Sequence, residues 1–309
     1  MTAQTLTRRT LLTGLTATAA GLMVAGSTAR TSLAAPFVQT PTTLNLGFVP
    51  GEDAETRLKR YEPVTDYLKT VLEMEVKGWI GTDYTATVEA MRSRKVDAAL
   101  YGPFSYVLAA HVADARSMVV SGYADGTPST YNSLIVTHAN SGITTIDELR
   151  GRSFSFVDPA STSGHLIPRS LLVKAGIEPD RDLKAIFAGG HDASLLAING
   201  AKVDAGAVSS SQYQRMTETG IIDANKVVVL ATSDPIPGSP WATRGSLDPT
   251  IVGRLRDAVL QMHTVIAPEV LKEFLSGGAT QYVVAEDTMY DPIRDVARIL
   301  NLDLTTIRG

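Results

Sequence analysis

The residues of this sequence with the clearest chemical character form a run of hydroxyl side chains. Ser161, Thr162 and Ser163 stand in succession before a glycine, between an apolar run that predicts a buried strand and an amphipathic pattern that predicts a helix. Free N–H groups and the helix dipole favour an anion at such a helix start, and hydroxyl groups donate further hydrogen bonds. Because one hydroxyl is enough to cap a helix, three in succession predict an anion-binding corner that needs no lysine or arginine.

Similar polar corners follow other predicted strands. Tyr84 and Tyr101 can each donate a phenolic hydrogen bond while the ring walls a ligand, although a tyrosine at a strand end more often belongs to the core. His191 starts a predicted helix whose dipole disfavours the imidazolium, so we expect a neutral ring that donates one hydrogen bond to a ligand, or a surface cap residue. Glu52 is placed either to accept a hydrogen bond from a protonated ligand oxygen or to neighbour a helix N-cap.

A catalytic role for the same corner is weakly supported. Ser161, His165 and Asp158 are the residue types of a hydrolase triad, but the sequence has no Gly-x-Ser-x-Gly elbow and no group that would hold a base against the serine. A metal site is not indicated either, because there is no HExxH motif and no close histidine pair. The histidines are His111, His138, His165, His191 and His263. We therefore expect no catalytic residue, no metal and no cofactor.

The polar corners belong to a chain that alternates short apolar runs with helical patterns. Strands are predicted in the first half at 44–49, 74–80, 98–101 and 118–123, with helices at about 53–72 and from residue 84. In the second half strands are predicted at 133–137, 153–157, 185–188 and 205–208, with helices at about 163–175 and from residue 191. Residues 247–300 are helical by periodicity. This alternation predicts parallel sheets flanked by helices, with ligands at the carboxyl ends of the strands.

A weak internal repeat indicates that the chain forms two similar lobes. Residues 91–102 and 198–209 each contain the end of a helical pattern, a Lys-Val-Asp-Ala turn into a buried strand, and the start of another helix. Two lobes that present their strand-to-helix corners to a shared cleft explain this recurrence, although a common turn between helix and strand also recurs by chance.

Two segments are predicted to cross between the lobes, one at 122–132 and a proline-rich one at 233–240. Three prolines and a glycine in the second segment exclude a helix and a central strand, which predicts a stiff extended linker. The first lobe then comprises residues 43–131 and 236–309, and the second lobe comprises residues 132–235. We predict an α/β fold with two lobes, each a sheet flanked by helices, joined by two crossover segments.

The N-terminal residues predict export from the cytoplasm. Arg8 and Arg9 precede an uncharged stretch at 13–28, and residues 32–35 supply the small side chains that a signal peptidase requires. The apolar stretch is too short and too weakly hydrophobic for a stable transmembrane span. We predict that residues 1–35 form a cleaved twin-arginine signal peptide and that the mature protein is periplasmic or secreted, without stable membrane insertion. An uncleaved amphipathic anchor is the alternative.

Composition restricts the class of protein further. A chain of 309 residues with 44% hydrophobic and 19% charged residues can bury the cores of two domains. Its 28 basic and 32 acidic residues give a net charge of −4 and form no basic stripe for nucleic acid or anionic lipid. There is no cysteine for disulfides, zinc thiolate sites or lipid attachment. We expect a monomer that does not bind nucleic acid.

Taken together, these motifs resemble a known family. The sequence is similar to the phosphate/phosphite/phosphonate-binding proteins of ABC transporters at Leu44–Pro50, Asp83–Tyr84, Val96–Pro103, Asp158–Gly164, Gly190–Asp192 and Pro235–Pro240. The resemblance implies a type II periplasmic binding fold, and an ABC permease with its ATPase as partners. It also implies that the phosphorus oxygens are held by Ser161, Thr162, Ser163, Tyr84, Tyr101 and His191.

The specificity of this chain is predicted to differ from that of family members that bind 2-aminoethylphosphonate. Those members place acidic side chains after a strand of the second lobe and within the proline-rich crossing, where they pair with the ammonium group. Ser211 and Ser239 stand at the matching positions here and cannot form that pair. The loss of a charged partner costs about 1.5 to 3 kcal/mol. We therefore expect a small ligand without an amine, such as phosphite, methylphosphonate, hypophosphite or a related phosphonate.

Two alternatives within the binding class remain open from the sequence. A periplasmic sensor protein that presents its ligand to a membrane receptor needs the same closing clamp as an importer component. A binder of sulfonates or other organic anions on the same fold is less favoured, because the corner is rich in hydroxyl groups and the sequence shows no arginine motif for the cleft.

Overall fold

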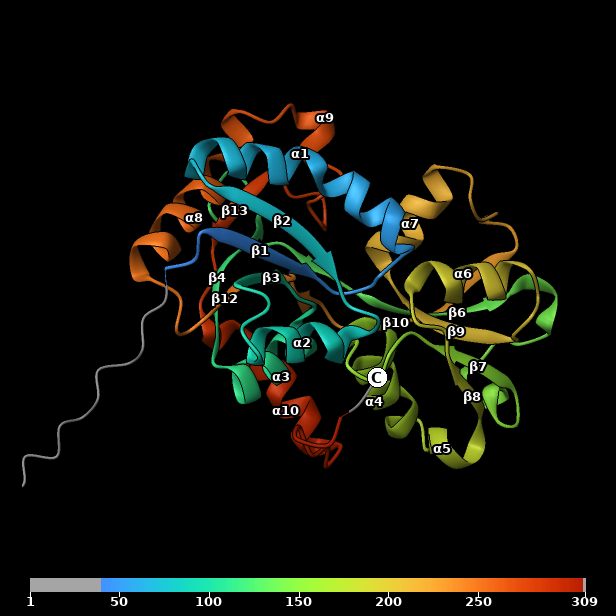
Figure 1. Cartoon of the computed structure of the whole chain (residues 1–309). Helices are drawn as coiled ribbons and strands as arrows, with labels where there is room; N and C mark the ends of the chain where they lie inside the picture. Colours follow the sequence, from blue (N-terminus) through green and yellow to red (C-terminus); the bar gives the residue numbers. More distant parts are fainter. Residues whose placement is uncertain (1–39, 308–309) are drawn as a thin grey trace, which may run out of the picture. The chain divides into compact units, whose positions relative to one another are not determined.

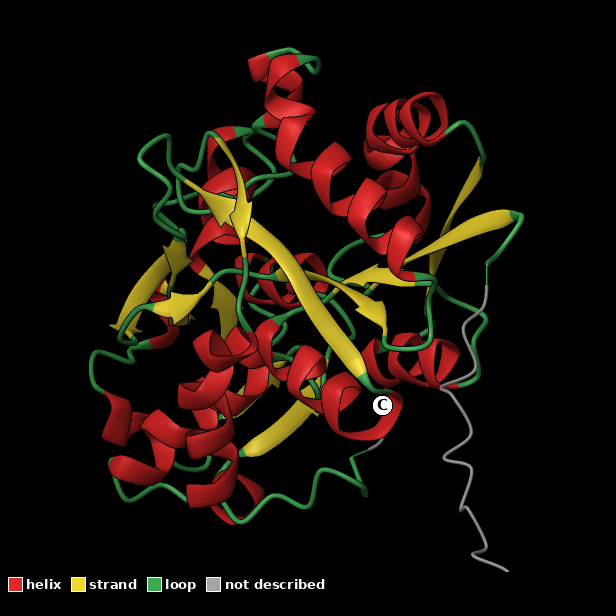
Figure 2. Cartoon of the chain, turned by 90° about the vertical axis from the view of Figure 1, so that its left-hand side faces the viewer, coloured by secondary structure: helices red, strands yellow, loops and turns green. Residues whose placement is uncertain are grey.

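The computed structural model describes residues 40–307, which form two mixed sheets, each flanked by helices, and a short two-stranded ribbon (Figure 1, Figure 2). We call the first sheet with its helices the first lobe, and the second sheet with its helices the second lobe. The predicted signal peptide at 1–35 lies outside the described residues. Within residues 40–307 no helix has both the length and the apolar character needed to cross a membrane.

The first lobe is built on a six-stranded sheet. The strands in spatial order are β13 (Gln281–Val284), β4 (Ala115–Gly122), β12 (Pro240–Arg244), β3 (Ala98–Leu100), β1 (Thr43–Phe48) and β2 (Glu75–Ile80). β1 pairs in parallel with β2 and β3, as predicted. β12 is antiparallel to β3 and β4, and β13 is antiparallel to β4. The prediction of a purely parallel sheet was wrong because β12 and β13 enter the sheet on the return of the chain from the second lobe.

Helices of the first lobe cover this sheet. They are α1 (Ala54–Leu72), α2 (Tyr84–Arg92), α3 (Pro103–Ala113), α8 (Pro249–Gln261), α9 (Pro268–Leu271) and α10 (Asp291–Ile299), with 3₁₀ turns at Met262–Thr264 and Asp287–Tyr290. Local sequence sets where they begin. Asp53 caps α1 by accepting a hydrogen bond from the Thr56 N–H at 2.9 Å, and Asp83 caps α2 in the same way.

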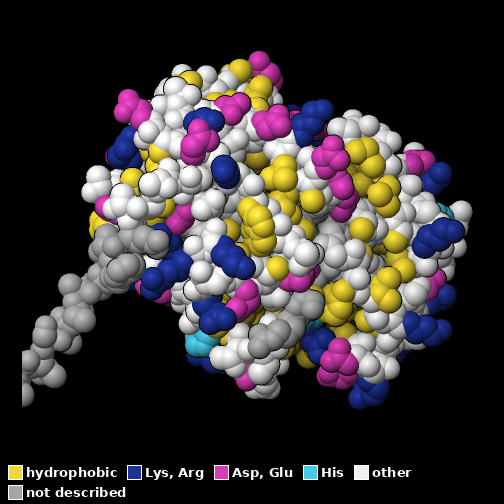
Figure 3. Space-filling view, viewed as in Figure 1, with side chains coloured by type: hydrophobic (Ala, Val, Ile, Leu, Met, Phe, Trp, Pro, Cys, Tyr) yellow, Lys and Arg dark blue, Asp and Glu magenta, His cyan; other side chains and the backbone are white. Residues whose placement is uncertain are grey.

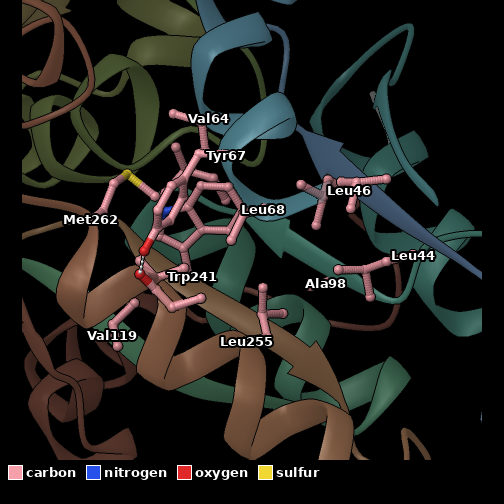
Figure 4. Packing of buried hydrophobic residues seen from close by; sticks show 14 of the residues in the cluster. Leu44, Leu46, Val64, Tyr67, Leu68, Ala98, Val119, Trp241, Leu255 and Met262 are labelled. Atoms are coloured by element: carbon pink, nitrogen blue, oxygen red, sulfur yellow. Dashed lines mark hydrogen bonds between the residues drawn. The ribbon is translucent and has the colours of Figure 1, made fainter. Parts of the chain in front are cut away.

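One hydrophobic core of the first lobe lies between its sheet and the helices α1 and α8, and a second involves α2, α3 and α10. Leu44 and Leu46 of β1 and Trp241 of β12 are fully buried in the first of these cores, and Figure 4 shows Trp241 beside Tyr67 of α1. The Tyr67 hydroxyl donates to the carbonyl of Ala258 at 2.8 Å and so connects α1 with α8. The alternating apolar residues of β1 direct this packing because successive side chains point to opposite faces of a strand.

The second lobe contains a five-stranded sheet in which β7 pairs in parallel with β8 and β9, and β6 is antiparallel to β9 and β10. The strands in spatial order are β10 (Val227–Thr232), β6 (Ser133–His138), β9 (Ala205–Ser209), β7 (Ser153–Phe156) and β8 (Lys184–Phe187). Its helices are α4 (Ile167–Lys174), α5 (Pro179–Asp182), α6 (His191–Asn199) and α7 (Ser210–Glu218), with a π-helical turn at Thr162–Leu166 and 3₁₀ turns at Ala139–Ser141 and Ile146–Leu149. The helix predicted at 163–175 therefore begins as a π-helical turn.

The internal repeat corresponds to the same local structure in both lobes. Arg94 and Ala201, at equivalent positions, both adopt left-handed backbone conformations with φ of 60° and 51°. Three residues later, Asp97 and Asp204 each accept a hydrogen bond at 2.9 Å from a backbone N–H of a neighbouring strand, β1 in the first lobe and β7 in the second. The left-handed turn thus places an aspartate where it joins the incoming strand to its neighbour.

The two predicted crossings pair with each other. Thr130–Tyr131 forms β5 and Ile236–Pro237 forms β11, and the two strands are antiparallel. The prediction that the proline-rich segment excludes a central strand was wrong, because β12 begins at Pro240 between β3 and β4. Proline is tolerated as the first residue of that strand, where its carbonyl accepts the Tyr101 N–H at 3.0 Å.

The C-terminal region also departs from its predicted structure. Residues 247–300 contain α8, α9 and α10, as the periodicity predicts, but they also contain the edge strand β13. At four residues, β13 is too short to show a strand period. Its pairing with β4 is a long-range property of the sheet.

The face of the molecule in Figure 3 carries side chains of both charge signs, interspersed with small apolar areas. Ile186 and Phe187, on the edge strand β8, are each 50% exposed. The mixed charge on this face agrees with the small net charge of the chain.

Candidate ligand-binding site

A cavity of about 170 Å³ lies where strands of both lobes end. It is smaller than the roughly 300–1,000 Å³ of pockets for drug-sized ligands, so its size suits a small molecule. Among the predicted ligand-binding residues, those that line the cavity are Tyr84, Tyr101, Ser161, Thr162, Ser163, His191, Ser211 and Ser239. The fold therefore brings together side chains that are up to 155 positions apart, from Tyr84 to Ser239.

Helix starts converge on this cavity. Its lining includes the first residue or the N-cap of five helical segments: Tyr84 of α2, Gly102 of α3, Thr162 of the π-helical turn, His191 of α6 and Ser209 of α7. Each helix start carries a partial positive charge and N–H groups without an intrahelical partner. Their convergence favours an anion even without a full positive charge at the same place.

The hydroxyl run Ser161–Ser163 is buried, with 1–2% exposure, at one of these helix starts. Ser161 caps the turn, since its Oγ accepts the Gly164 N–H at 3.1 Å and its own O–H remains able to donate. Gly164 is required for packing, because a Cβ atom there would lie 2.4 Å from the side chain of Val157. The glycine thus lets the hydroxyl run pack against Val157, which directly follows β7.

Thr162 joins the two lobes at the cavity wall. Its Oγ1 accepts the backbone N–H of Phe104, in the first turn of α3, at 2.7 Å. The bond uses a lone pair of the Thr162 hydroxyl and does not engage its proton. A second bond between the lobes runs from the Tyr84 N–H to Asp158 Oδ2 at 3.3 Å.

The two predicted tyrosines differ in what their hydroxyl groups do. Tyr84 is buried, and burial is the main cause that raises the pKa of its hydroxyl group; the charge of Asp158 raises it further. The charge of Arg57 and a hydrogen bond with Ser161 lower this pKa but do not cancel the rise. Its phenol is therefore protonated and can donate. Tyr101 is fully buried and its hydroxyl already donates to the Thr87 carbonyl at 3.3 Å, so it contributes its ring as a wall and is not the predicted donor.

His191 is held as a neutral imidazole. The ring Nδ1 accepts the Ser209 N–H at 3.2 Å, which leaves the ring proton on Nε2. The backbone N–H of His191 donates to the Gly51 carbonyl at 3.1 Å. Burial, and then the charge of Arg57, lower the pKa of His191 to about 3. The ring therefore offers one Nε2–H donor at neutral pH, in the protonation state that the sequence predicts.

Tyr131 was not recognised from the sequence. It belongs to β5 in the first crossing and lines the cavity. Burial raises its pKa to about 12, against hydrogen bonds with the hydroxyl groups of Ser163 and Thr162 that lower it. The sequence signal that could have identified it is a large aromatic side chain within a segment predicted to be a linker.

Arginine side chains also line the cavity, although the sequence shows no arginine motif for the cleft. Arg57 and Arg60 lie in α1, which starts at the carboxyl end of β1. Their Cζ atoms lie 5.5 and 5.6 Å from the centre of the Tyr61 ring. Arginines at this spacing look like the solvated face of a helix, and only the placement of α1 turns them toward the cavity.

Glu52 was predicted as an acceptor for a ligand but lies outside the cavity lining. Its buried carboxylate binds Arg60 and, at 2.6 Å, Arg215 of the second lobe. Arg57 lies 3.7 Å away. The carboxylate is therefore already engaged by guanidinium groups, and it connects α1 with α7.

Ser211 and Ser239 both line the cavity, one at the start of α7 and the other just before β12. Among the described lining residues the charged side chains are Arg57, Arg60 and Glu273. Two positive charges and one negative charge therefore border the cavity.

The geometry does not assemble a hydrolase triad. His165 lies outside the cavity lining, its Nδ1 bonded to the Pro159 carbonyl at 2.8 Å and its ring against Phe156 and Phe187. Burial lowers the pKa of His165 to about 4. Within residues 40–307 no group of three or more histidine, aspartate or glutamate side chains is arranged to hold a metal ion.

A family model described as ABC transporter, phosphonate, periplasmic substrate-binding protein matches residues 46–290. The chain belongs to this family. The match spans both lobes and contains every predicted ligand-binding residue, and it confirms the resemblance inferred from the motifs. The members of this family are periplasmic binding components of ABC transporters.

Individual relatives of the family agree with this assignment. The phosphate-import protein PhnD of Mycolicibacterium smegmatis is 29% identical over 279 residues, which cover 84% of this chain and 86% of that protein. A binding protein component of an ABC phosphonate transporter from Pseudomonas aeruginosa has a TM-score of 0.76 and 25% identity, over 84% of this chain and 86% of that one.

A similar fold is found in a protein whose structure was solved with a ligand bound. PhnD1 from Prochlorococcus marinus, solved with methylphosphonate, has a TM-score of 0.75 and 23% identity, over 84% of this chain and 99% of that one. These likenesses confirm the predicted two-lobed type II periplasmic binding fold.

Proposed function

We propose that this protein captures a small phosphorus oxyanion in the cavity between its lobes and delivers it to an ABC importer. The observation that carries this proposal is the buried hydroxyl run Ser161–Ser163 at one of five helix starts around a small cavity. Phosphite, methylphosphonate and related phosphonates present compact groups of oxygen acceptors that match such donors. The names of the relatives, which refer to phosphate import, phosphonate transport and methylphosphonate, support the same class of ligand.

The mechanism that we propose is closure of the lobes around the ligand, without any covalent step. Oxygen atoms of the ligand accept hydrogen bonds from the hydroxyl run, from Tyr84 and from His191 Nε2. Closure also forms the bond between Thr162 and Phe104. The closed form is then recognised by the permease, and the free energy of ligand binding shifts the equilibrium toward that form.

The lobes that close are proposed to be residues 43–131 with 236–309, and residues 132–235. The boundaries fall at the β5–β11 ribbon, where the chain crosses twice. A two-stranded ribbon of this length has few hydrogen bonds to resist bending, so it can act as the hinge.

Titration calorimetry tests the proposed function. The purified protein is titrated with phosphite, methylphosphonate, phosphate, 2-aminoethylphosphonate and sulfate. We expect tight binding of at least one small phosphorus oxyanion without an amine and much weaker binding of 2-aminoethylphosphonate. If no phosphorus compound gives a heat of binding, the proposal is contradicted. If the protein hydrolyses phosphate esters, it is an enzyme instead.

Sulfonates are the second candidate class of ligand. Arg57 and Arg60 in the cavity lining remove one argument against them, since arginine groups suit any compact oxyanion. Methanesulfonate is isosteric with methylphosphonate but carries a single negative charge. A preference for methanesulfonate in the same titration would favour sulfonate uptake.

Export by the twin-arginine route is proposed from Arg8 and Arg9 in the predicted signal peptide at 1–35. We propose that the mature protein is a periplasmic or secreted monomer. Replacing both arginines with lysine should retain the precursor in the cytoplasm, as detected by fractionation and immunoblotting. Normal export of that variant would refute the route without affecting the proposed ligand.

A further inference from the structure

The cavity lining contains a charged and aromatic portion in addition to the hydroxyl groups. Arg57, Arg60 and Tyr61 of α1 contribute to it, together with Glu273 and Phe274 beyond α9. Neither the hydroxyl run nor a helix start accounts for two guanidinium groups at a small cavity. Their hydrogen bonds show which of them is available to a ligand.

Arg60 is occupied by protein partners. One of its terminal nitrogens donates to Glu52, and Nη1 donates to the Glu273 carbonyl at 3.2 Å. The other oxygen of Glu52 accepts a hydrogen bond from Arg215 at 2.6 Å. Each oxygen of the Glu52 carboxylate therefore binds a different arginine.

Arg57 is in a different situation. The Nε of Arg57, like that of Arg60, is buried without a hydrogen-bond partner among the described residues. What differs is the terminal nitrogens, because Arg57 Nη1 lies 3.7 Å from Glu52 Oε1, which is longer than a hydrogen bond. The side chain is only 12% exposed, so water satisfies few of its five donors. A charged donor that is buried without a partner is costly and gains most from an acceptor that enters the cavity.

The position of Arg57 is next to the proposed oxyanion donors. A Cβ atom at Gly51 would lie 3.0 Å from Arg57 Nη1 and 3.8 Å from the Tyr84 hydroxyl, so both groups flank the same glycine. The positive charge also reaches His191, whose pKa it lowers after the larger effect of burial. A ligand held by Tyr84 and His191 is thus within reach of this guanidinium group.

We propose that Arg57 binds the ligand directly and determines its charge type, donating to an acceptor oxygen and disfavouring any cationic substituent. The inference rests on the proposed function and narrows its ligand class to phosphorus oxyanions whose substituent is absent, neutral or anionic. Ser211 and Ser239 provide no carboxylate to offset the Arg57 charge for an ammonium group, and the one carboxylate among the described lining residues, that of Glu273, belongs to an exposed residue. Methylphosphonate and phosphonoacetate belong to the accepted class, and 2-aminoethylphosphonate does not.

The test compares the binding of these three compounds to wild type and Arg57→Gln by titration calorimetry. Loss of a charged hydrogen bond weakens methylphosphonate and phosphonoacetate about ten- to hundredfold. The affinity for 2-aminoethylphosphonate falls by a smaller factor, so the ratio of the methylphosphonate affinity to the 2-aminoethylphosphonate affinity is smaller in the variant than in wild type. Lys59→Gln is the matched control, because Lys59 is an exposed cation of the same helix that lies outside the cavity lining, and its affinities should equal those of wild type.

The outcomes separate this inference from the proposed function. If wild type binds methylphosphonate and Arg57→Gln binds it with the same affinity and selectivity, the role of Arg57 is overturned and the proposed function is left intact. Failure of wild type to bind any phosphorus oxyanion overturns both. If Arg57→Gln does not fold, Arg57→Lys replaces it, since lysine keeps the charge but not the planar array of donors. Arg57→Lys should bind methylphosphonate more weakly than wild type and still reject 2-aminoethylphosphonate. If Arg57→Lys binds methylphosphonate with the affinity of wild type, the inference is contradicted.

Discussion

Replacing Thr162 with valine removes one hydroxyl from the cavity and one hydrogen bond between the lobes, at nearly constant side-chain volume. Thr162 Oγ1 accepts the Phe104 N–H at 2.7 Å, and Thr162 is 2% exposed. Phe104 lies in the first turn of α3, where the helix itself supplies no acceptor for this N–H. Valine therefore leaves a buried donor without a partner whenever the lobes are closed.

The size of the effect follows from the state in which the bond exists. An unpaired buried N–H costs about 1 to 3 kcal/mol, and in an open form water satisfies the same group. The cost therefore falls on the closed form alone, and it raises the dissociation constant of the ligand roughly ten- to hundredfold. Because every ligand depends on the same closure, the affinities for methylphosphonate, phosphite and phosphate should fall by similar factors.

Calorimetry of Thr162→Val with these three ligands measures the loss, and Thr137→Val is the matched control. Thr137 is 1% exposed and donates to the Asp204 carbonyl at 2.7 Å, wholly within the second lobe. Its valine variant should lose about 1 kcal/mol of unfolding free energy and keep its ligand affinity. Unchanged affinity in Thr162→Val, or an equal loss in Thr137→Val, would refute the reasoning from lobe closure.

Three further predictions concern stability and the shape of the hydroxyl run. Arg244→Met breaks a buried ion pair with Asp97, in which Arg244 Nη2 lies 2.9 Å from Asp97 Oδ1, and should cost about 3 to 5 kcal/mol in urea unfolding; a loss below about 1 kcal/mol would contradict it. Burial lowers the pKa of His165 to about 4 from 6.5, so the unfolded chain binds more protons and stability falls as the pH drops from 6.5 to 4. His165→Phe should remove roughly 3 kcal/mol of that fall, measured by unfolding between pH 4 and 7, and an unchanged slope would count against it. Gly164→Ala places a Cβ atom 2.4 Å from the Val157 side chain and should cost about 1 to 3 kcal/mol and weaken methylphosphonate binding; wild-type melting and affinity would show that the turn adapts.

Local sequence patterns predicted the elements around the cavity because each pattern reflects short-range physical chemistry. Alternating apolar residues predicted β1. The helix predicted from about Asp53 begins at Ala54, with Asp53 as its N-cap. The repeated Lys-Val-Asp-Ala turn predicted equivalent corners in both lobes. Pro240 shows the limit of such arguments, because local rules exclude it from a central strand while the sheet accepts it as a first residue.

A neutral His191 was predicted because a helix start disfavours a cation. In the structure, burial and then the charge of Arg57 lower its pKa. The placement of Ser161–Ser163 at a helical start was also predictable, because it depends only on the residues on either side of them. The positions of Arg57 and Tyr131 in the cavity lining were not predictable in this way. One looked like a solvated helix residue and the other like part of a linker.

The hydroxyl-rich corner was readable from the sequence because it depends on neighbours within a few positions along the chain, and motifs spread from residue 44 to residue 240 together indicated the family. Which side chains share the cavity depends on the tertiary structure. It brought Arg57 beside Tyr84 and His191, committed the Tyr101 hydroxyl to Thr87, and occupied the Glu52 carboxylate with two arginines. Such contacts join residues far apart in the chain, and the free energy of each depends on burial and partners that no local pattern encodes.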